Sequence, residues 1–166
     1  MIVKSPFKPA WWLPGPHSQT LWPNRLRPRP RVHLISERIE LVDGDFIDLE
    51  WTARHDGPIV LVLHGLEGHT RSGYSAGILR QIHQRGWRGV FMYQRSCSGT
   101  PNRLHRRYHA GKTSDLQTII ELLTQREPHT PIAVVGYSLG GNMLLKWLGE
   151  LEHTPPALAA AVAVSV

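Results

Sequence analysis

The chain has 166 residues, enough for one domain of ordinary size and too few for two. Hydrophobic residues make up 41% and charged residues 19%, a composition that excludes general disorder. No apolar run approaches the roughly 18 residues of a membrane span, and prolines interrupt the N-terminus where a signal peptide needs an apolar stretch. Cys97 is the single cysteine and has no partner for an internal disulfide. We therefore expect a soluble, cytoplasmic protein without a transmembrane segment.

The chain is basic, with nineteen Lys and Arg against thirteen Asp and Glu, a net charge of +6 and a sequence pI near 10.0. Clustered cations can bind nucleic acid by releasing counterions from phosphates. However, no zinc-ligand spacing, helix-turn-helix pattern or aromatic RNA-binding strand accompanies them. A solvated basic surface is therefore favoured, and no nucleic-acid partner is expected. The clustered cations are Arg25, Arg27, Arg29, Arg31, Arg103, Arg106 and Arg107.

Residues 1–36 are rich in proline, tryptophan and arginine and show neither helical nor strand periodicity. Such a segment becomes ordered only by lying on another part of the protein, and Trp11, Trp12 and Trp22 are the expected anchors. An interfacial membrane anchor is the alternative, but it requires an amphipathic helix, which the prolines exclude over any useful length. We interpret residues 1–36 as an N-terminal arm and residues 37–166 as the core domain.

The core domain alternates between strand and helix patterns. Two alternating stretches are joined by a hairpin-type turn at Asp43-Gly44, and a continuous apolar run, Ile59 to Leu63, predicts a strand covered on both faces. An antiparallel pair followed by alternating helices and strands is typical of a mostly parallel, doubly wound sheet. The predicted strands cover residues 37–42, 46–51, 59–63, 89–93, 132–135 and 157–166, and the predicted helices contain residues 78–82, 114–123 and 139–151.

Two of these helices carry capping signals. Gly86 is a plausible C-terminal cap for the first helix, since glycine adopts the left-handed conformation found there. Ser114 opens the second helix and has Gln117 three residues later, the spacing of a capping box.

The residues that follow the fifth predicted strand carry the most specific chemical signal. Gly136-Tyr137-Ser138-Leu139-Gly140 is a G-x-S-x-G pattern between a buried strand and an apolar helix. A serine in such a sharp turn has a strained backbone, and its neighbours two positions away must be small because strand and helix nearly touch. The turn exposes the hydroxyl near a helix N-terminus, where negative charge is stabilised. We therefore predict that Ser138 is a nucleophile rather than part of a chance match.

A second signal lies one β-α unit earlier, where His64-Gly65-Leu66 ends the continuous apolar strand. A His-Gly turn at this place allows the Leu66 amide to face the carbonyl oxygen of a substrate, and the Leu139 amide supplies a second donor. By itself the pattern indicates a simple turn, but together with the serine it predicts an oxyanion hole. We expect His64 to brace this turn rather than to act as a base.

Motifs spread over nearly the whole chain resemble one family. They are residues 16–20 (PHSQT), 43–49 (DGDFIDL), 64–68 (HGLEG), 95–109 and 136–142. The chain resembles the N-terminal half of a YheT-like α/β-hydrolase, a carboxylesterase branch related to animal abhydrolase-domain lipases. The loop at 95–109, together with the serine turn, makes the resemblance specific to this branch. Ser96 departs from the family, which usually has glycine at that position, so we expect a slightly different turn there.

The resemblance implies a Ser–acid–His triad that acts on small-molecule carboxylic esters or lipid-like esters without a metal or cofactor. Only Ser138 can be carried over, because the acid and the histidine follow the serine in this fold. The residues after it offer Glu150, Glu152 and His153, on or just past a helix that leads away from the serine. The expected fold is an α/β-hydrolase truncated after about the sixth strand, inactive by itself because the triad acid and base are missing.

Other classes of function remain open. The chain can instead be a non-catalytic remnant or an interaction module of the same fold, and a basic nucleic-acid-binding protein is the weakest alternative. The last predicted strand is apolar and nearly uncharged, and it would lie at a sheet edge. We therefore also expect self-association through that strand.

Overall fold

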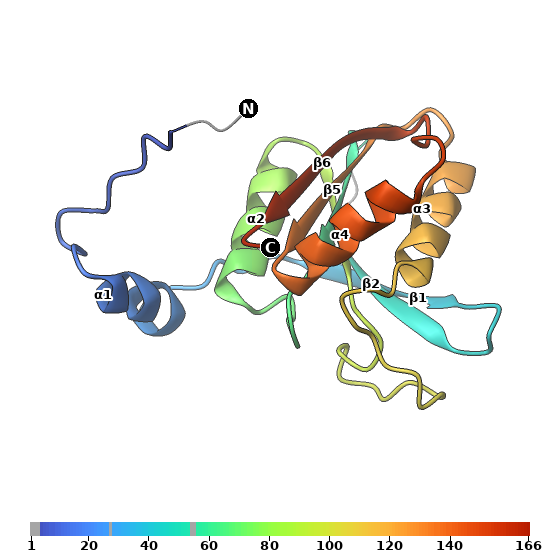
Figure 1. The fold of residues 1–166 in the computed structure, drawn as a ribbon, viewed down its shortest axis with the longest axis horizontal. Helices are drawn as coiled ribbons and strands as arrows, with labels where there is room; N and C mark the ends of the chain where they lie inside the picture. The colour runs from blue at the N-terminus through green and yellow to red at the C-terminus, as the bar shows by residue number, and fades with distance from the viewer. Residues whose placement is uncertain (1–3, 27, 54–55) are drawn as a thin grey trace.

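The computed structural model describes residues 4–26, 28–53 and 56–166. Within these ranges, one sheet of six strands carries helices on both faces, and the N-terminal arm extends away from it (Figure 1). The helical elements are α1 (Pro16–Leu21), the π-helical turn η1 (Trp22–Leu26), α2 (Gly73–Gln84), α3 (Ser114–Arg126) and α4 (Leu139–Glu150). The strands are β1 (Leu34–Glu40), β2 (Phe46–Thr52), β3 (Ile59–Leu63), β4 (Arg88–Met92), β5 (Ile132–Tyr137) and β6 (Leu158–Val164).

The strand order in the sheet is β1-β2-β4-β3-β5-β6. β1 and β2 form an antiparallel hairpin, and Gly44 in its turn has a φ of +81°, which glycine adopts at little cost. β2 is also antiparallel to β4, whereas β4, β3, β5 and β6 are parallel to one another. The predicted mostly parallel, doubly wound sheet is confirmed. The carboxyl ends of its parallel strands all lie on the same side of the molecule. Open α/β sheets bind their ligands just outside these strand ends.

Apolar side chains pack against both faces of the sheet. On one face, α3 and α4 bury Leu116, Ile119 and Trp147 against the strands. On the other face, α2 buries Leu79 and Ile82 against β3 and β4. β3 is buried at every position, as its continuous apolar run predicts for a strand covered on both sides.

The first strand begins earlier than its sequence pattern predicts. β1 starts at Leu34 rather than Glu37, because its pairing with β2 continues to Thr52. The division of the chain into an arm (residues 1–36) and a core domain stays a prediction. In the described residues, the pairing of β1 with β2 begins at Leu34, inside the proposed arm.

One of the two predicted helix caps is wrong. Thr113, not Ser114, precedes the first helical residue of α3, and no side chain caps that end. The Gln117 side chain accepts a hydrogen bond from the Trp147 indole N–H (2.5 Å), so a tertiary contact replaces the predicted capping box. The other cap is confirmed, because Gly86 follows α2 with a φ of +74°.

The N-terminal arm differs from its prediction in two ways. Pro16 opens the short helix α1, since proline is favoured at the first helical position, where its missing N–H is not needed. The expectation that tryptophans anchor the arm on the core is wrong: Trp11 is 90% exposed and Trp12 is 49% exposed. Trp12 instead packs edge-on against Trp22, with ring centroids 5.1 Å apart, so the rings cover each other.

β6 lies at the edge of the sheet with much of its apolar surface exposed, including half of Val162. An apolar strand with an unpaired edge is a template for pairing with another chain. We expect the 166-residue chain, expressed alone, to self-associate, and Val162→Lys to raise the monomeric fraction in size-exclusion chromatography. Val42→Lys, at a fully exposed position outside β6, is the matched control. A single monomer peak for the unaltered chain would contradict this expectation.

Candidate active site

Ser138 occupies the sharp turn between β5 and α4. Its φ and ψ are +50° and −116°, a strained conformation that costs a non-glycine residue about 1–3 kcal/mol. Two main-chain hydrogen bonds hold the turn: the Ser138 N–H donates to the Val164 carbonyl of β6 (2.9 Å), and the Asn142 N–H donates to the Ser138 carbonyl (2.9 Å). The serine is exposed, so its hydroxyl is accessible at the carboxyl ends of the parallel strands.

Gly136 and Gly140 allow β5, α4 and the end of β3 to approach closely. A Cβ atom built on Gly136 would lie 2.5 Å from the Gly140 carbonyl oxygen, and one built on Gly140 would lie 2.5 Å from the His64 carbonyl oxygen. These distances are too short for a real Cβ atom, so both positions require glycine. The contacts are the physical reason for small residues two positions before and after the serine.

A methyl group at Gly140 is therefore expected to destabilise the fold. We expect Gly140→Ala to lower the free energy of unfolding by about 3 kcal/mol, because the methyl group meets rigid main chain rather than a flexible side chain. Gly149→Ala is the control, because Gly149 lies in the same helix with open space around its Cβ position. It should be neutral or stabilising by about 0.5–1 kcal/mol. Urea unfolding followed by circular dichroism measures both, and equal stabilities would contradict the packing argument.

The turn after β3 lies against the serine. A Cβ atom built on Gly65 would be 3.3 Å from the Ser138 Cβ and 3.9 Å from its Oγ. In the part of the chain that the structure describes, neither the Leu66 amide nor the Leu139 amide donates a hydrogen bond. Both amides are therefore available to a bound anion. Their action as an oxyanion hole stays a prediction.

Two tyrosines fix this turn. The Tyr108 hydroxyl accepts a hydrogen bond from the Glu67 N–H (2.8 Å), and the Tyr74 hydroxyl accepts a longer one from the Gly65 N–H (3.4 Å). Glu67 itself has a φ of +48°, so the turn is strained as well as held. The sequence patterns predict a functional role for neither tyrosine. Tyr108 lies in the loop at 95–109 that carries the family resemblance, and this position is the sequence feature that points to its role.

His64 is completely buried and stacks on Phe91, with ring centroids 5.5 Å apart. The Gln94 N–H donates to Nε2 (2.9 Å), while Nδ1 lies 2.5 Å from the Gly65 carbonyl oxygen and 3.1 Å from the Gly68 main-chain nitrogen. Burial lowers the pKa of His64, so the ring is neutral. Because both ring nitrogens bond to main chain, this geometry suits a brace for the turn and leaves no nitrogen free to act as a base.

No histidine or carboxylate among the described residues forms a hydrogen bond with the Ser138 hydroxyl. Glu150 lies at the far end of α4, where it accepts a hydrogen bond from Thr113 (2.7 Å) and pairs with Lys146. His153 follows α4 and is exposed. Glu150 and His153 thus lie at and beyond the end of α4 that is opposite Ser138, as the sequence predicts.

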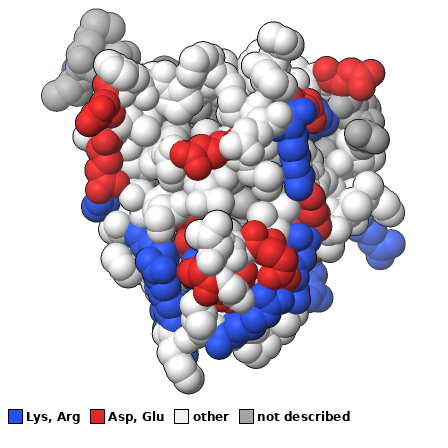
Figure 2. Space-filling view, turned by 90° about the vertical axis from the view of Figure 1, so that its right-hand side faces the viewer, with Lys and Arg blue, Asp and Glu red and all other residues white. Residues whose placement is uncertain are grey.

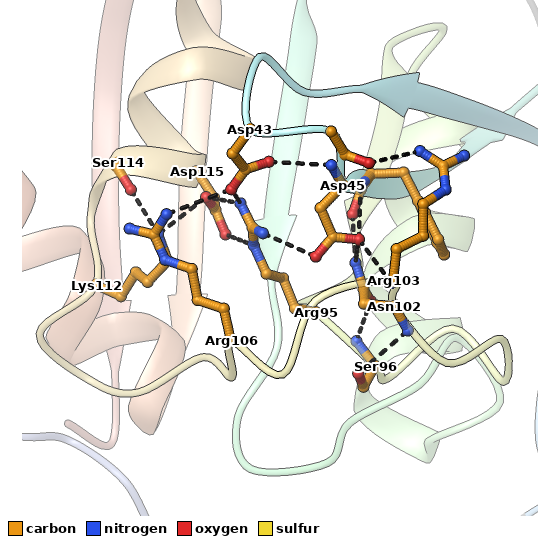
Figure 3. Close-up of polar contacts among 12 residues, drawn as sticks. Asp43, Asp45, Arg95, Ser96, Asn102, Arg103, Arg106, Lys112, Ser114 and Asp115 are labelled. Carbon is orange, nitrogen blue, oxygen red and sulfur yellow. Dashed lines mark hydrogen bonds and ion pairs between the residues drawn. The ribbon is translucent and has the colours of Figure 1, made fainter.

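A buried ion cluster supports the loop that follows β4 (Figure 3). The Arg95 guanidinium donates two hydrogen bonds to Asp115 (2.8 and 2.9 Å) and lies 2.9 Å from a carboxylate oxygen of both Asp43 and Asp45. Lys112 adds a second cation at 3.2 Å from Asp115. Burial alone would raise the pKa of Asp115, but the hydrogen bonds from Arg95 and the charge of Lys112 outweigh it and lower that pKa. The cluster thus joins the hairpin, the loop and α3.

The same cluster determines the backbone at the start of the loop. The Asn102 side chain donates to the Asp45 carboxylate (2.8 Å) and to the Phe46 carbonyl (2.7 Å), and its oxygen accepts from the Ser96 N–H (2.5 Å). Ser96 has a φ of +66°, in the left-handed region that favours glycine. Glycine adopts this conformation at less cost than serine does, and a turn that differs from that of the family stays a prediction.

The family model described as serine aminopeptidase, S33 (Hydrolase_4), matches residues 54–165. The chain belongs to the α/β-hydrolase family. Among solved structures, the chain resembles the Pyrococcus furiosus esterase Pf2001 with a TM-score of 0.64 at 18% identity, over 80% of this chain and 51% of that one. At this level of identity the likeness shows the fold.

Curated relatives define the branch of the family. The chain is 43% identical over 151 residues to YheT of Escherichia coli (strain K12), and this alignment covers 88% of the chain and 44% of YheT. It is 30% identical over 169 residues to the phospholipase ABHD3 of Homo sapiens, and this alignment covers 96% of the chain and 41% of ABHD3. The predicted YheT-like identity is confirmed, and the chain spans less than half the length of these relatives.

No cluster of three or more His, Cys, Asp or Glu side chains in the described ranges is arranged to hold a metal ion. No helix in them combines the length and the apolar character needed to cross a bilayer.

Proposed function

We propose that this hydrolase acts on carboxylic esters, with Ser138 as the nucleophile and the Leu66 and Leu139 amides as the oxyanion hole. The observation that carries the proposal is the strained, exposed serine beside two main-chain amides that have no acceptor among the described residues. A backbone cost of about 1–3 kcal/mol persists where the surrounding structure enforces it, and such positions cluster at active sites. The ABHD3 relative is named as a phospholipase, which supports lipid-like esters as one substrate class.

The proposed reaction follows from this geometry. The Ser138 Oγ forms a bond to the ester carbonyl carbon and gives its proton to a base, while the carbonyl oxygen becomes an anion that the two amides stabilise. When the carbonyl re-forms, the alcohol leaves with the proton that the base returns, and an acyl-serine remains for hydrolysis by water. The triad acid and base are proposed to come from a segment corresponding to the remainder of YheT. The chain alone is therefore expected to be nearly inactive.

A non-catalytic interaction module of the same fold is the competing function. It explains the sheet and the packed glycines, but it gives no reason to hold an exposed serine in a costly conformation beside two unpaired amides. We therefore favour the hydrolase. That it acts in the cytoplasm stays a prediction.

Nucleic-acid binding is less favoured because acidic side chains pair with many of the cations. Figure 2 shows basic and acidic side chains intermixed on one face of the molecule. Arg103 pairs with Glu40, and Arg106 lies 3.3 Å from a carboxylate oxygen of Asp43. Two of the three cations that the sequence clusters in the loop are thus neutralised within the chain, which weakens the electrostatic case for phosphate binding.

The experiment that separates the two leading functions uses an alkyl fluorophosphonate, which forms a covalent adduct with activated serines. The protein is a chimera in which the segment of YheT beyond the aligned region is joined to this chain. An ester hydrolase forms the adduct on the peptide that contains Ser138, as measured by mass spectrometry, and Ser138→Ala forms none. Absence of the adduct from a chimera that folds cooperatively would support the interaction module instead.

A further inference from the structure

The Leu66 amide belongs to the turn of residues 64–68, here called the oxyanion turn, and takes its direction from a planar peptide group. The Gly65 carbonyl and the Leu66 N–H are parts of the same trans peptide, so they point in opposite directions. That carbonyl accepts a hydrogen bond from the Gly68 N–H (3.3 Å) and lies 2.5 Å from Nδ1 of the buried His64. Because the carbonyl is held toward His64, the Leu66 N–H points away from that ring.

The contact from Gly68 depends on a reversal of the chain at Glu67. Glu67 has a φ of +48°, in the left-handed region that is unfavourable for a residue with a Cβ atom. This conformation brings the chain back, so that the Gly68 nitrogen lies near both the Gly65 carbonyl and His64 Nδ1 (3.1 Å). An extended Glu67 would direct Gly68 away from both groups and leave the peptide between Gly65 and Leu66 free to rotate.

Tyr108 holds Glu67 in this conformation. Its hydroxyl accepts a hydrogen bond from the Glu67 N–H (2.8 Å), and its ring lies edge-on to His64 with centroids 6.1 Å apart. The net contribution of one hydrogen bond is of the same order as the cost of a left-handed residue. This single bond is therefore sufficient to decide whether Glu67 keeps its conformation.

The loop of residues 95–112, which carries Tyr108, is fixed at both ends by one carboxylate. Asp115 accepts hydrogen bonds from Arg95 at the start of the loop (2.8 and 2.9 Å) and lies 3.2 Å from the Lys112 ammonium at its end (Figure 3). All three side chains are buried. The loop is thus closed on α3, and Tyr108 extends from a supported main chain.

The same loop also contacts the helix that follows the nucleophile. The Asn142 side chain donates to the Ala110 carbonyl (3.3 Å), while the Asn142 N–H donates to the Ser138 carbonyl (2.9 Å). The loop therefore joins the serine turn through Ala110 and the oxyanion turn through Tyr108.

We propose that Tyr108 is a positioning residue for the oxyanion hole and that its hydroxyl sets the direction of the Leu66 amide through Glu67. The inference rests on the proposed function and adds a residue to it. Negative charge develops on the ester carbonyl oxygen in the transition state, and an amide stabilises it best when it already points there. Loss of the Tyr108 hydroxyl therefore slows the chemical step and leaves binding of the ester nearly unchanged.

The test compares Tyr108→Phe with Tyr93→Phe in the chimera, with 4-nitrophenyl acetate as the substrate. The Tyr93 ring also lies edge-on to His64, with centroids 6.3 Å apart. Its hydroxyl, however, bonds to Thr70 (3.1 Å) and Glu50 (3.1 Å) rather than to the oxyanion turn, so it is the matched control.

We expect Tyr108→Phe to lower kcat by about 10- to 100-fold with KM changed by less than about twofold, because a misdirected amide weakens only the transition state. Tyr93→Phe should change kcat by less than about twofold. Equal losses of kcat in the two variants, or a rise in KM without a fall in kcat, would overturn the proposal.

A second measurement uses the 166-residue chain and needs no turnover. Hydrogen–deuterium exchange is followed by mass spectrometry in the peptide of residues 64–68, with a peptide from β5 as the reference for overall stability. Tyr108→Phe should accelerate exchange of the Glu67 and Gly68 amides by at least about fivefold and leave the β5 peptide unchanged, because only a local bond is lost. Unchanged exchange in the peptide of residues 64–68 would also overturn the proposal.

The positioning role and the proposed reaction can fail separately. If the unaltered chimera shows no Ser138-dependent activity while Tyr108→Phe exchanges faster at residues 64–68, the hold of Tyr108 on the turn is supported and the hydrolase reaction is not. If the chimera is active and Tyr108→Phe hydrolyses the ester as fast as Tyr93→Phe, the reaction is supported and the positioning role is wrong.

Discussion

The chimera of this chain with the remaining segment of YheT is expected to hydrolyse 4-nitrophenyl acetate readily, and Ser138→Ala should lower its turnover by about 10⁴- to 10⁶-fold. A serine hydroxyl is a weak nucleophile until a neighbouring base accepts its proton. In the described chain no such base contacts Ser138, and His64 has both ring nitrogens bonded to main chain. The 166-residue chain alone should therefore release 4-nitrophenol barely above the buffer rate, and Ser138→Ala should change that rate little.

Four proteins make this experiment decisive: the chain and the chimera, each with and without Ser138. Strong, Ser138-dependent turnover by the short chain would show that a base lies within these residues, and His64→Gln would then be the first variant to measure. A chimera that folds cooperatively but is inactive would contradict the proposed reaction itself.

The second large effect is expected at the buried ion cluster around Arg95. Asp115→Ala should lower the free energy of unfolding by about 3 kcal/mol, because it leaves a buried guanidinium without its bidentate partner. Glu40→Ala removes the partner of Arg103 in an ion pair that is about half exposed and should change stability little. Urea unfolding at neutral pH compares the two variants. Equal losses of unfolding free energy in the two variants would show that the buried ion pair contributes no more to stability than the exposed one.

The pH dependence of stability gives a further readout of the Asp115 variant. Because the pKa of Asp115 is lowered on folding, its contribution is present above the unfolded pKa of about 3.9 and is lost as the pH falls below that value toward the folded pKa. Asp115→Ala should therefore be less sensitive than the unaltered chain to acid in this range. An unchanged slope of stability against pH would contradict the assignment.

The elements that follow local patterns could be predicted well from the sequence. Period-two alternation and a continuous apolar run were sufficient for the strands, and G-x-S-x-G between strand and helix predicted the strained backbone at Ser138. The pattern of the arm does not predict the short helix that begins at Pro16, because prolines interrupt it; at the first helical position, however, proline favours the start of a helix.

The contacts between distant segments could not be predicted in the same way. Arg95 meets Asp45 across fifty residues of sequence, and Tyr108 meets Glu67 across forty-one. No spacing rule links residues that far apart, since only the folded topology brings them together.

The hydrogen bond from the Ser138 N–H to the Val164 carbonyl has a consequence for how the chain folds. The strained serine turn is not a local unit, because β5 and β6 are parallel and pair only after α4 has crossed back over the sheet. Parallel pairing of this kind is slow, since the chain between the strands must be ordered before the contact forms. We therefore expect Ser138 to keep an ordinary, unstrained backbone through the early stages of folding and to be drawn into its final conformation only as β6 docks.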